Sequence, residues 1–180
     1  NLQYPYAMTK RLGEEILIDD GKIYNINTIS LRLFNVYGTK SRTSGTYGAM
    51  FGVFLAQKLK NKPLTVVGTG YQKRDFTYVT DVVNAFYKCI NYKGKKKFFN
   101  IGTGKPVSIN RIVKKFKSKK INIPKRPGEP DQTNADNKQA IKELKWRPKI
   151  SIEQGIKLIL KNINYWKTAP VWTPKKIKTA

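Results

Sequence analysis

Residues 6–10, Tyr-Ala-Met-Thr-Lys, begin a segment that predicts a helix over residues 6–20. Gly21 stands where a left-handed residue commonly ends a helix, so we expect the helix to stop there. A tyrosine and a lysine four positions apart share one helix face, which brings the ammonium of Lys10 near whatever the phenol of Tyr6 touches. A free phenol titrates near pH ~10, but a fixed positive charge nearby favours the phenolate. The two side chains have the outline of a proton-transfer pair, although this spacing also occurs by chance on many helices.

Beyond this helix, strands and helices are predicted to alternate, which is typical of an α/β protein. The predicted strands cover residues 28–34, 64–67, 75–79 and 97–101, and the first of them should end at Asn35. Further helices are predicted from after residue 48 to about 60, from Asp81 onward, from Ser108 to about 117, over 137–144, and from Ser151 to about 166. Residues 121–131 are expected to be extended or looped, and residues 168–180 irregular.

Caps and apolar spacing give these helices their expected ends and inner faces. Asp81 and Ser108 are expected to cap their helices, and Ser151 with Gln154 fits a capping box. The apolar residues expected to face the core are Phe51, Phe54, Leu55 and Leu59 on one helix, and Val83, Phe86, Tyr87 and Ile90 on the next.

The charge of the chain is its strongest compositional deviation. There are 36 Lys and Arg against 11 Asp and Glu, a formal net charge of +25 in 180 residues. Such a charge suggests nucleic acid or another polyanion. The lysines are spread over nearly every predicted helix and turn, however, and Ile and Asn are also frequent, which indicates a compositional bias. A non-catalytic polyanion-binding module is therefore kept as the alternative from another class, and we expect neither nucleic acid nor membrane as a partner.

The remaining composition excludes several classes of site. The sequence has no histidine and one cysteine, Cys89, so it lacks the parts of a zinc site, a Ser-His nucleophile or an internal disulfide. We expect Cys89 to pack on an apolar helix face in a reducing cytoplasm. The sequence has no run of 18 apolar residues, so no membrane-spanning helix is predicted. The first residues have neither an initiator methionine nor a signal layout, and we interpret them as the interior of a longer protein.

Four further motifs follow the first segment in order. They are Leu-Phe-Asn-Val-Tyr-Gly at 33–38, Leu-Thr-Val-Val-Gly at 64–68, Lys-Arg-Asp-Phe-Thr-Tyr-Val-Thr-Asp at 73–81 and Arg-Pro-Gly-Glu at 126–129. With Tyr-Pro-Tyr-Ala-Met-Thr-Lys at 4–10, this series resembles the extended short-chain dehydrogenase/reductase family, the nucleotide-sugar epimerases and dehydratases. The resemblance covers nearly all of the chain.

The resemblance implies a role for individual residues. Implied catalytic residues are Tyr6 and Lys10; implied NAD contacts are Tyr6, Lys10 and Phe34; implied substrate contacts are Asn35, Thr65, Val67, Arg74, Arg126 and Glu129. The two arginines would hold the diphosphate, since a guanidinium matches phosphate oxygens, and Glu129 would reach the ribose. Asp75 and the Asn-Ile-Gly-Thr-Gly segment at 100–104 are expected to be structural.

The implied fold is α/β: the C-terminal part of a Rossmann-type doubly wound sheet, with the Tyr-Lys helix and a late strand, plus a small substrate domain. Residues 1–47 would belong to the NAD-binding domain, 48–166 mainly to the nucleotide-sugar domain, and 167–180 to a basic tail. The implied activity is an NAD-dependent epimerase, most closely a UDP-hexose 4-epimerase, working through a 4-keto sugar as a cytoplasmic homodimer. A 4,6-dehydratase or reductase of the same family is the alternative. The glycine-rich cofactor loop and the assisting Ser or Thr are not in these residues, so we expect the 180-residue chain alone to be inactive.

Overall fold

The computed structural model describes residues 5–43, 50–125, 129–171 and 173. Its helices are α1 Pro5–Ile23, α2 Met50–Leu59, α3 Val79–Ile90, α4 Ile109–Phe116, α5 Lys138–Glu143, α6 Ile152–Lys161 and a 3₁₀ turn, η1, Ile163–Trp166. Its strands are β1 Ser30–Leu33, β2 Asn35–Tyr37, β3 Leu64–Val67, β4 Lys73–Arg74, β5 Phe76–Tyr78, β6 Phe98–Ile101, β7 Val107–Ser108 and β8 Lys120–Ile123.

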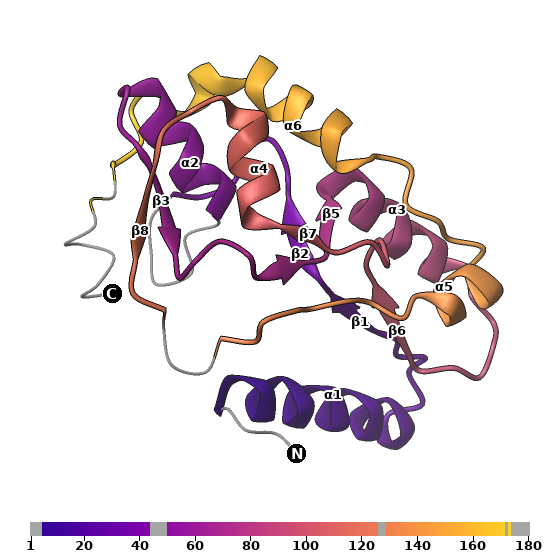
Figure 1. Ribbon diagram of the computed structural model, residues 1–180. Helices are drawn as coiled ribbons and strands as arrows, with labels where there is room; N and C mark the ends of the chain where they lie inside the picture. The colour runs from indigo at the N-terminus through magenta and orange to yellow at the C-terminus, as the bar shows by residue number, and fades with distance from the viewer. Residues whose placement is uncertain (1–4, 44–49, 126–128, 172, 174–180) are drawn as a thin grey trace.

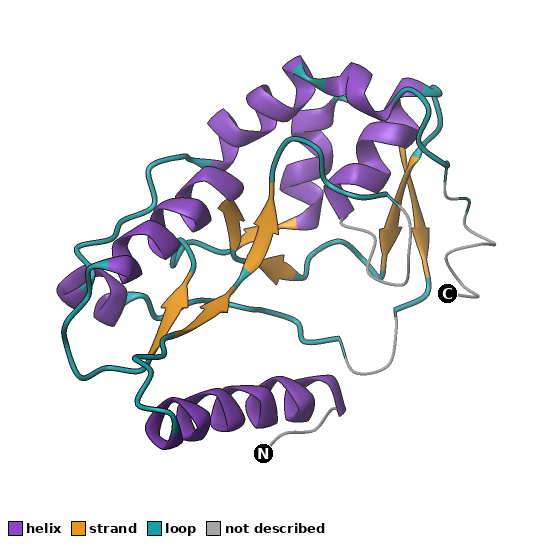
Figure 2. Cartoon of the chain, turned by 180° about the vertical axis from the view of Figure 1, so that it is seen from behind, coloured by secondary structure: helices purple, strands orange, loops and turns teal. Residues whose placement is uncertain are grey.

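The strands pair in twos, and three of the four described pairs are parallel. β1 pairs with β6, β2 with β5 and β3 with β8 in parallel, whereas β4 and β7 are antiparallel. Parallel neighbours need crossover connections, and helices supply them here. Figures 1 and 2 show α2, α4 and α6 on one side of the strands and α1 on the opposite side. The α/β class predicted from the sequence is confirmed.

The first strand changes its partner where the sequence predicted its end. β1 is in register with β6 from Ser30 opposite Phe98 onward, and the N–H of Phe34 still donates to the carbonyl of Ile101 at 3.0 Å. From Asn35 the chain continues as β2 and pairs with β5 instead. The predicted boundary at Asn35 is therefore confirmed, although the backbone stays extended beyond it because β5 offers a second partner.

Two apolar cores hold these elements. The larger joins α2, α4 and α6 to the strands, with Tyr37 stacked on Phe51 at 4.5 Å between ring centres. The smaller lies between α3, α5 and β6, where the indole N–H of Trp146 donates to the carbonyl of Asp81 at 2.9 Å. The predicted core face of α2 is confirmed: three members are buried and Leu59 packs against the larger core.

The predicted inner face of α3 is wrong. Its members, Val83, Phe86, Tyr87 and Ile90, are all exposed. Val82 and Ala85 are buried instead, and Cys89 packs against the same core. Asp81 is not the cap; it is buried inside the first turn, where its carboxylate accepts the N–H groups of Lys149 and Ile150 at 3.0 and 2.9 Å. A buried carboxylate needs such donors, so this contact decides which of two apolar faces turns inward.

Helix ends agree with the sequence where a side chain makes the cap. Ser108 accepts the N–H of Arg111, and Ser151 with Gln154 forms the predicted capping box. By contrast, α1 continues through Gly21, and the left-handed residue is Asn25 at φ 53°.

Gly21 is required for packing rather than for ending the helix. A Cβ on this residue would lie 2.5 Å from Oγ1 of Thr28. Two other boundaries also differ from the prediction: the strand expected over 75–79 is confined to β5, and α6 ends at Lys161 before the 3₁₀ turn. Residues 120–123, partly expected as loop, form β8 because β3 offers a parallel partner.

Candidate functional site

The tyrosine and lysine of the opening motif lie side by side in the first turns of α1. The ammonium nitrogen of Lys10 is 5.3 Å from the centre of the Tyr6 ring. Both side chains are exposed, Tyr6 by 60%. The predicted shared helix face is therefore present, with a positive charge beside a phenol that solvent or a ligand can reach.

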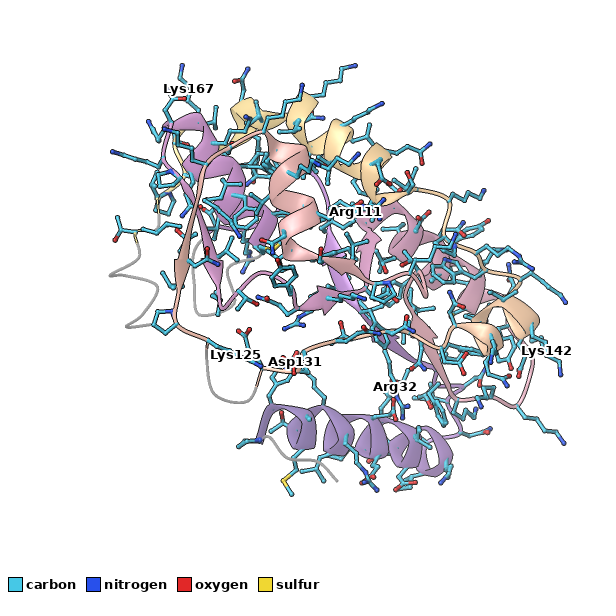
Figure 3. The ribbon with its side chains drawn as sticks, in the orientation of Figure 1. Arg32, Arg111, Lys125, Asp131, Lys142 and Lys167 are labelled. Atoms are coloured by element: carbon cyan, nitrogen blue, oxygen red, sulfur yellow. The ribbon has the colours of Figure 1, made fainter. Side chains whose placement is uncertain are left out.

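A carboxylate on the same helix face fixes α1 to β1. Glu14 lies four residues beyond Lys10, and it accepts hydrogen bonds from Ser30 Oγ at 2.8 Å and from Nε of Arg32 at 2.9 Å, with a second contact from Nη2. The hydrogen bond from Arg32 is the largest cause that holds the pKa of Glu14 below its usual range. Figure 3 shows Arg32 reaching from β1 toward α1. Helix α1 is thereby joined to β1 through Glu14, one turn beyond Lys10.

The sequence analysis missed this anchor. A signal was available, since Tyr6, Lys10 and Glu14 form an i, i+4, i+8 series on one helix and a Ser-x-Arg segment begins the following strand. The guanidinium of Arg32 also lies 4.4 Å from the ring centre of Phe98, so β6 contributes to the same support.

Two predicted site residues occupy the switch between β1 and β2. Phe34 is half-buried against Gly102, and Asn35 is exposed, with its Oδ1 accepting from the hydroxyl of Thr133 at 3.3 Å. The N–H of Thr133 in turn donates to the carbonyl of Lys73 at 3.1 Å. Asn35 is thus linked through Thr133 to the segment that carries the predicted diphosphate arginine.

Arg74 and Glu129 meet although 55 residues separate them in the sequence. Nη2 of Arg74 lies 3.7 Å from Oε2 of Glu129, and their side chains are 13% and 31% exposed. Nη1 of Arg74 donates to the carbonyl of Lys73 at 3.0 Å, which leaves further donors on the guanidinium. The structure therefore brings together two of the residues predicted to contact the substrate, and Arg126 lies outside the described residues.

Both residues line a cavity of about 360 Å³ beside the end of β3, a size within the usual range for small-ligand sites. The lining carries both signs of charge: Gly68, Thr69, Tyr71, Gln72, Arg74, Lys125, Glu129, Pro130 and Asp131. Lys125 is paired with Asp131 at 2.6 Å, as Figure 3 allows the reader to follow. Three of these lining residues were not predicted from the sequence: Lys125, Asp131 and Tyr71.

One backbone edge of β3 points away from its partner strand β8. The N–H groups of Leu64 and Gly68 donate to the β8 side, at 2.8 Å each, so the alternate residues Thr65 and Val67 direct their peptide groups away from β8. At Thr65 this edge is occupied, because Gln57 accepts from the Thr65 N–H and donates to the Thr65 hydroxyl. The carbonyl of Val67 is occupied as well, since it accepts from Nε2 of Gln72 at 2.6 Å, and it is the next residue, Gly68, that lines the cavity.

Asp75 confirms its predicted structural role. The carboxylate is fully buried and accepts from N–H and Oγ1 of Thr103 at 2.8 and 2.5 Å, from the N–H of Gly104 at 2.8 Å and from that of Ala135 at 3.0 Å. The turn after β6 and the strand end next to Arg74 are joined in this way. Segment 100–104 is thus a structural turn and not a phosphate loop.

Metal binding and membrane crossing were the two remaining possibilities for the described part of the chain. No group of three His, Cys, Asp or Glu side chains there is placed to hold a metal ion. Within the same residues, no helix combines the length and the apolar character that crossing a membrane requires.

Comparisons with known proteins agree with these motifs. The sequence model of the NAD dependent epimerase/dehydratase family matches residues 1–102. The chain is 36% identical over 162 residues to a putative UDP-glucose 4-epimerase of Methanocaldococcus jannaschii, covering 87% of this chain and 52% of the relative. It is 34% identical over 165 residues to dTDP-4-dehydro-6-deoxyglucose reductase of Escherichia coli, covering 88% and 52%. The chain thus spans about half the length of these curated relatives.

Solved structures give the same result. UDP-glucose 4-epimerase of Thermotoga maritima, solved with UDP-glucose, matches with a TM-score of 0.81 at 29% identity, covering 91% of this chain and 53% of that one. UDP-glucuronic acid 4-epimerase of Bacillus cereus, solved with UDP-glucuronic acid and NAD, matches with a TM-score of 0.79 at 31% identity, covering 89% and 52%. The predicted Rossmann-type fold class is confirmed.

Proposed function

The chain belongs to the NAD dependent epimerase/dehydratase family, and from this premise we propose that it supplies the proton-transfer and nucleotide-sugar-binding residues of an NAD-dependent 4-epimerase acting on a UDP-hexose. The observation that carries the proposal is the Tyr6–Lys10 pair, which Glu14 holds toward the strands that bear Asn35. Homodimer formation and the domain limits at residues 47 and 166 are part of the same proposal.

In the proposed reaction, Tyr6 takes the proton of the sugar 4-hydroxyl and returns it when the centre has inverted. Lys10 holds the nicotinamide ribose, while backbone near Phe34 lies against the nicotinamide. NAD, when bound, supplies the hydride acceptor and donor. The residues present fit that group at its nicotinamide end, since an exposed phenol and an ammonium stand on one helix face.

The cavity beside β3 is the proposed diphosphate site. Arg74 has donors available beyond those used by Lys73 and Glu129, and a guanidinium matches phosphate oxygens. Glu129 is proposed to accept from the ribose hydroxyls, and Asn35 to contact the sugar phosphate. Arg126 is proposed as a second diphosphate ligand.

A reductase or dehydratase of the same family is the nearest alternative. It is supported by the similarity to the E. coli reductase, whose identity to this chain is close to that of the M. jannaschii relative. Product analysis of the enzyme that contains these residues distinguishes the reactions, because an epimerase interconverts UDP-glucose and UDP-galactose without net loss of water or consumption of NADH.

Binding of UDP to residues 1–180 tests the diphosphate site directly. Arg74→Ala should weaken UDP binding in calorimetry by about 1.5–3 kcal/mol, the range for hydrogen bonds to charged groups. Arg147→Ala is the matched control, since Arg147 is exposed and lies outside the cavity lining. Equal affinities of the two variants for UDP would contradict the assignment. If both variants were retained on heparin equally and in a steeply salt-dependent way, and neither bound UDP, the polyanion-binding alternative would be favoured.

Turnover tests the proton-transfer pair. In the enzyme assembled with a glycine-rich cofactor half, Tyr6→Phe should bind UDP normally and lose most turnover, because the ring remains and the transferable proton does not. Lys10→Met should impair both NAD affinity and rate. Residues 1–180 alone should form no UDP-galactose from UDP-glucose and NAD. Product formation by this chain, with saturable NAD binding, would contradict the proposal that the cofactor site is shared with other residues.

A further inference from the structure

Three hydrogen bonds from Asn110 and Asn122 hold the turn after β3. Gly68 and Gly70 have φ of 64° and 81°, a conformation that glycine adopts without strain. Nδ2 of Asn122 donates to the carbonyl of Gly68 at 2.6 Å, and Nδ2 of Asn110 donates to that of Thr69 at 3.2 Å. The N–H of Asn110 donates to the carbonyl of Gly70 at 2.9 Å. The backbone that leads into residue 71 is therefore fixed.

Tyr71 is presented by this fixed turn to solvent. Its side chain is 75% exposed, yet it belongs to the lining of the cavity that holds Arg74 and Glu129. Its N–H is bonded to Oγ1 of Thr69 at 3.4 Å, so the rigidity of the turn extends to the residue itself. The ring contributes little to the core, whereas a planar ligand in the cavity could cover it.

The cavity lining combines two kinds of side chain. Arg74 and Lys125 provide positive charge, and Tyr71 provides an aromatic surface on the same lining. A ligand that suits both kinds of side chain carries phosphate and a flat unsaturated ring, and a nucleoside diphosphate is such a molecule. Aromatic side chains bind bases by stacking, a contact that tolerates different bases.

We propose that Tyr71 is the stacking surface for the base of the nucleotide whose diphosphate Arg74 binds. The inference rests on the proposed function, which it extends from the diphosphate to the base. Gly68, the residue that follows β3, lines the same cavity as Tyr71 and Arg74, so the stacked base would lie beside the end of that strand.

Calorimetry of residues 1–180 with UDP and with inorganic pyrophosphate separates the base from the phosphates. Tyr71→Ala should weaken UDP binding by about 5- to 150-fold, the range expected for the loss of one stacked base. Its pyrophosphate affinity should stay within about twofold of wild type, because no charged ligand is lost. Tyr71→Phe should retain both affinities, since the ring remains.

Tyr87→Ala is the matched control, because Tyr87 is a similarly exposed tyrosine on α3 outside this cavity. Unchanged UDP affinity in Tyr71→Ala, or an equal loss for UDP and pyrophosphate, would overturn the stacking proposal while Arg74→Ala still reports on the diphosphate site. A wild-type chain that binds neither ligand would overturn the proposed function and the stacking proposal together.

Discussion

Replacing Asp75 by asparagine tests the buried carboxylate that joins the end of β4 to two other segments. Its Oδ1 accepts two hydrogen bonds from Thr103, and its Oδ2 accepts the N–H groups of Gly104 and Ala135. Asparagine has the same shape, but its amide nitrogen cannot accept a hydrogen bond. With the amide nitrogen in place of Oδ1, the Thr103 hydroxyl can rotate and accept from it, so only the N–H of Thr103 loses its acceptor; with the amide nitrogen in place of Oδ2, the N–H groups of both Gly104 and Ala135 lose theirs.

The size of the effect follows from that count. Each donor left unsatisfied in the interior costs about 1–3 kcal/mol, so the loss of one or two acceptors costs about 1–6 kcal/mol. Removing the buried charge offsets part of this cost, because an ionised carboxylate is itself expensive to desolvate. We expect the free energy of unfolding to fall by about 2–4 kcal/mol, a large part of the ~5–15 kcal/mol typical of a domain.

Urea unfolding at pH 7, followed by circular dichroism, measures this loss. Asp20→Asn is the matched control: Asp20 is exposed on α1, and its replacement should change the free energy of unfolding by no more than about 0.5 kcal/mol. If Asp75→Asn unfolded at the same urea concentration as Asp20→Asn, the carboxylate would not hold these segments and the reasoning would be refuted.

Two further changes test the packing and the anchor of α1. Gly155→Ala should destabilise the chain by about 1–3 kcal/mol in the same urea assay, since its Cβ would lie 1.9 Å from the hydroxyl of buried Tyr37. As the control, Gly13→Ala should stabilise α1 by roughly 0.5–1 kcal/mol, because a Cβ on Gly13 would have nothing within 4 Å. An unchanged free energy of unfolding in Gly155→Ala would show that α6 can move away from Tyr37. The contact with Arg32 lowers the pKa of Glu14, so its stabilisation is present above the ordinary glutamate pKa of about 4.3 and is lost as the pH falls through the lower folded value. The difference in unfolding free energy between wild type and Glu14→Gln should therefore narrow below about pH 4, and a difference that stays constant down to pH 2 would contradict the anchor.

Side-chain caps of helices could be predicted from the sequence, whereas the buried face of a helix that is apolar on two sides could not. Ser108 and Ser151 were identified as caps because the cap bond forms within three residues. The inner face of α3 was missed because the helix is apolar on two sides. Asp81 settles the choice through donors 68 and 69 residues away, at Lys149 and Ile150, and periodicity contains no information about them.

The candidate site shows the same limit. The spacing of Tyr6 and Lys10 gave their shared face directly, because four residues make about one helical turn. The approach of Arg74 to Glu129 was implied only by the resemblance to a family, since two segments 55 residues apart can meet in many ways. Tyr71 was given no role from the sequence, and only its place in the cavity lining gives it a candidate role.

The position of the anchor on α1 links stability to the proposed chemistry. Glu14 bonds Ser30 and Arg32, whereas Tyr6 lies eight residues earlier, about 12 Å along the helix at 1.5 Å per residue. A helix that turned by about 5° at Glu14 would therefore move Tyr6 by about 1 Å, and a displacement of that size can reduce a rate about 100-fold. The same rotation leaves both apolar cores intact, because the residues that form them lie outside α1. The Glu14–Arg32 contact is thus placed to govern the geometry of the proposed proton-transfer pair more strongly than the stability of the fold.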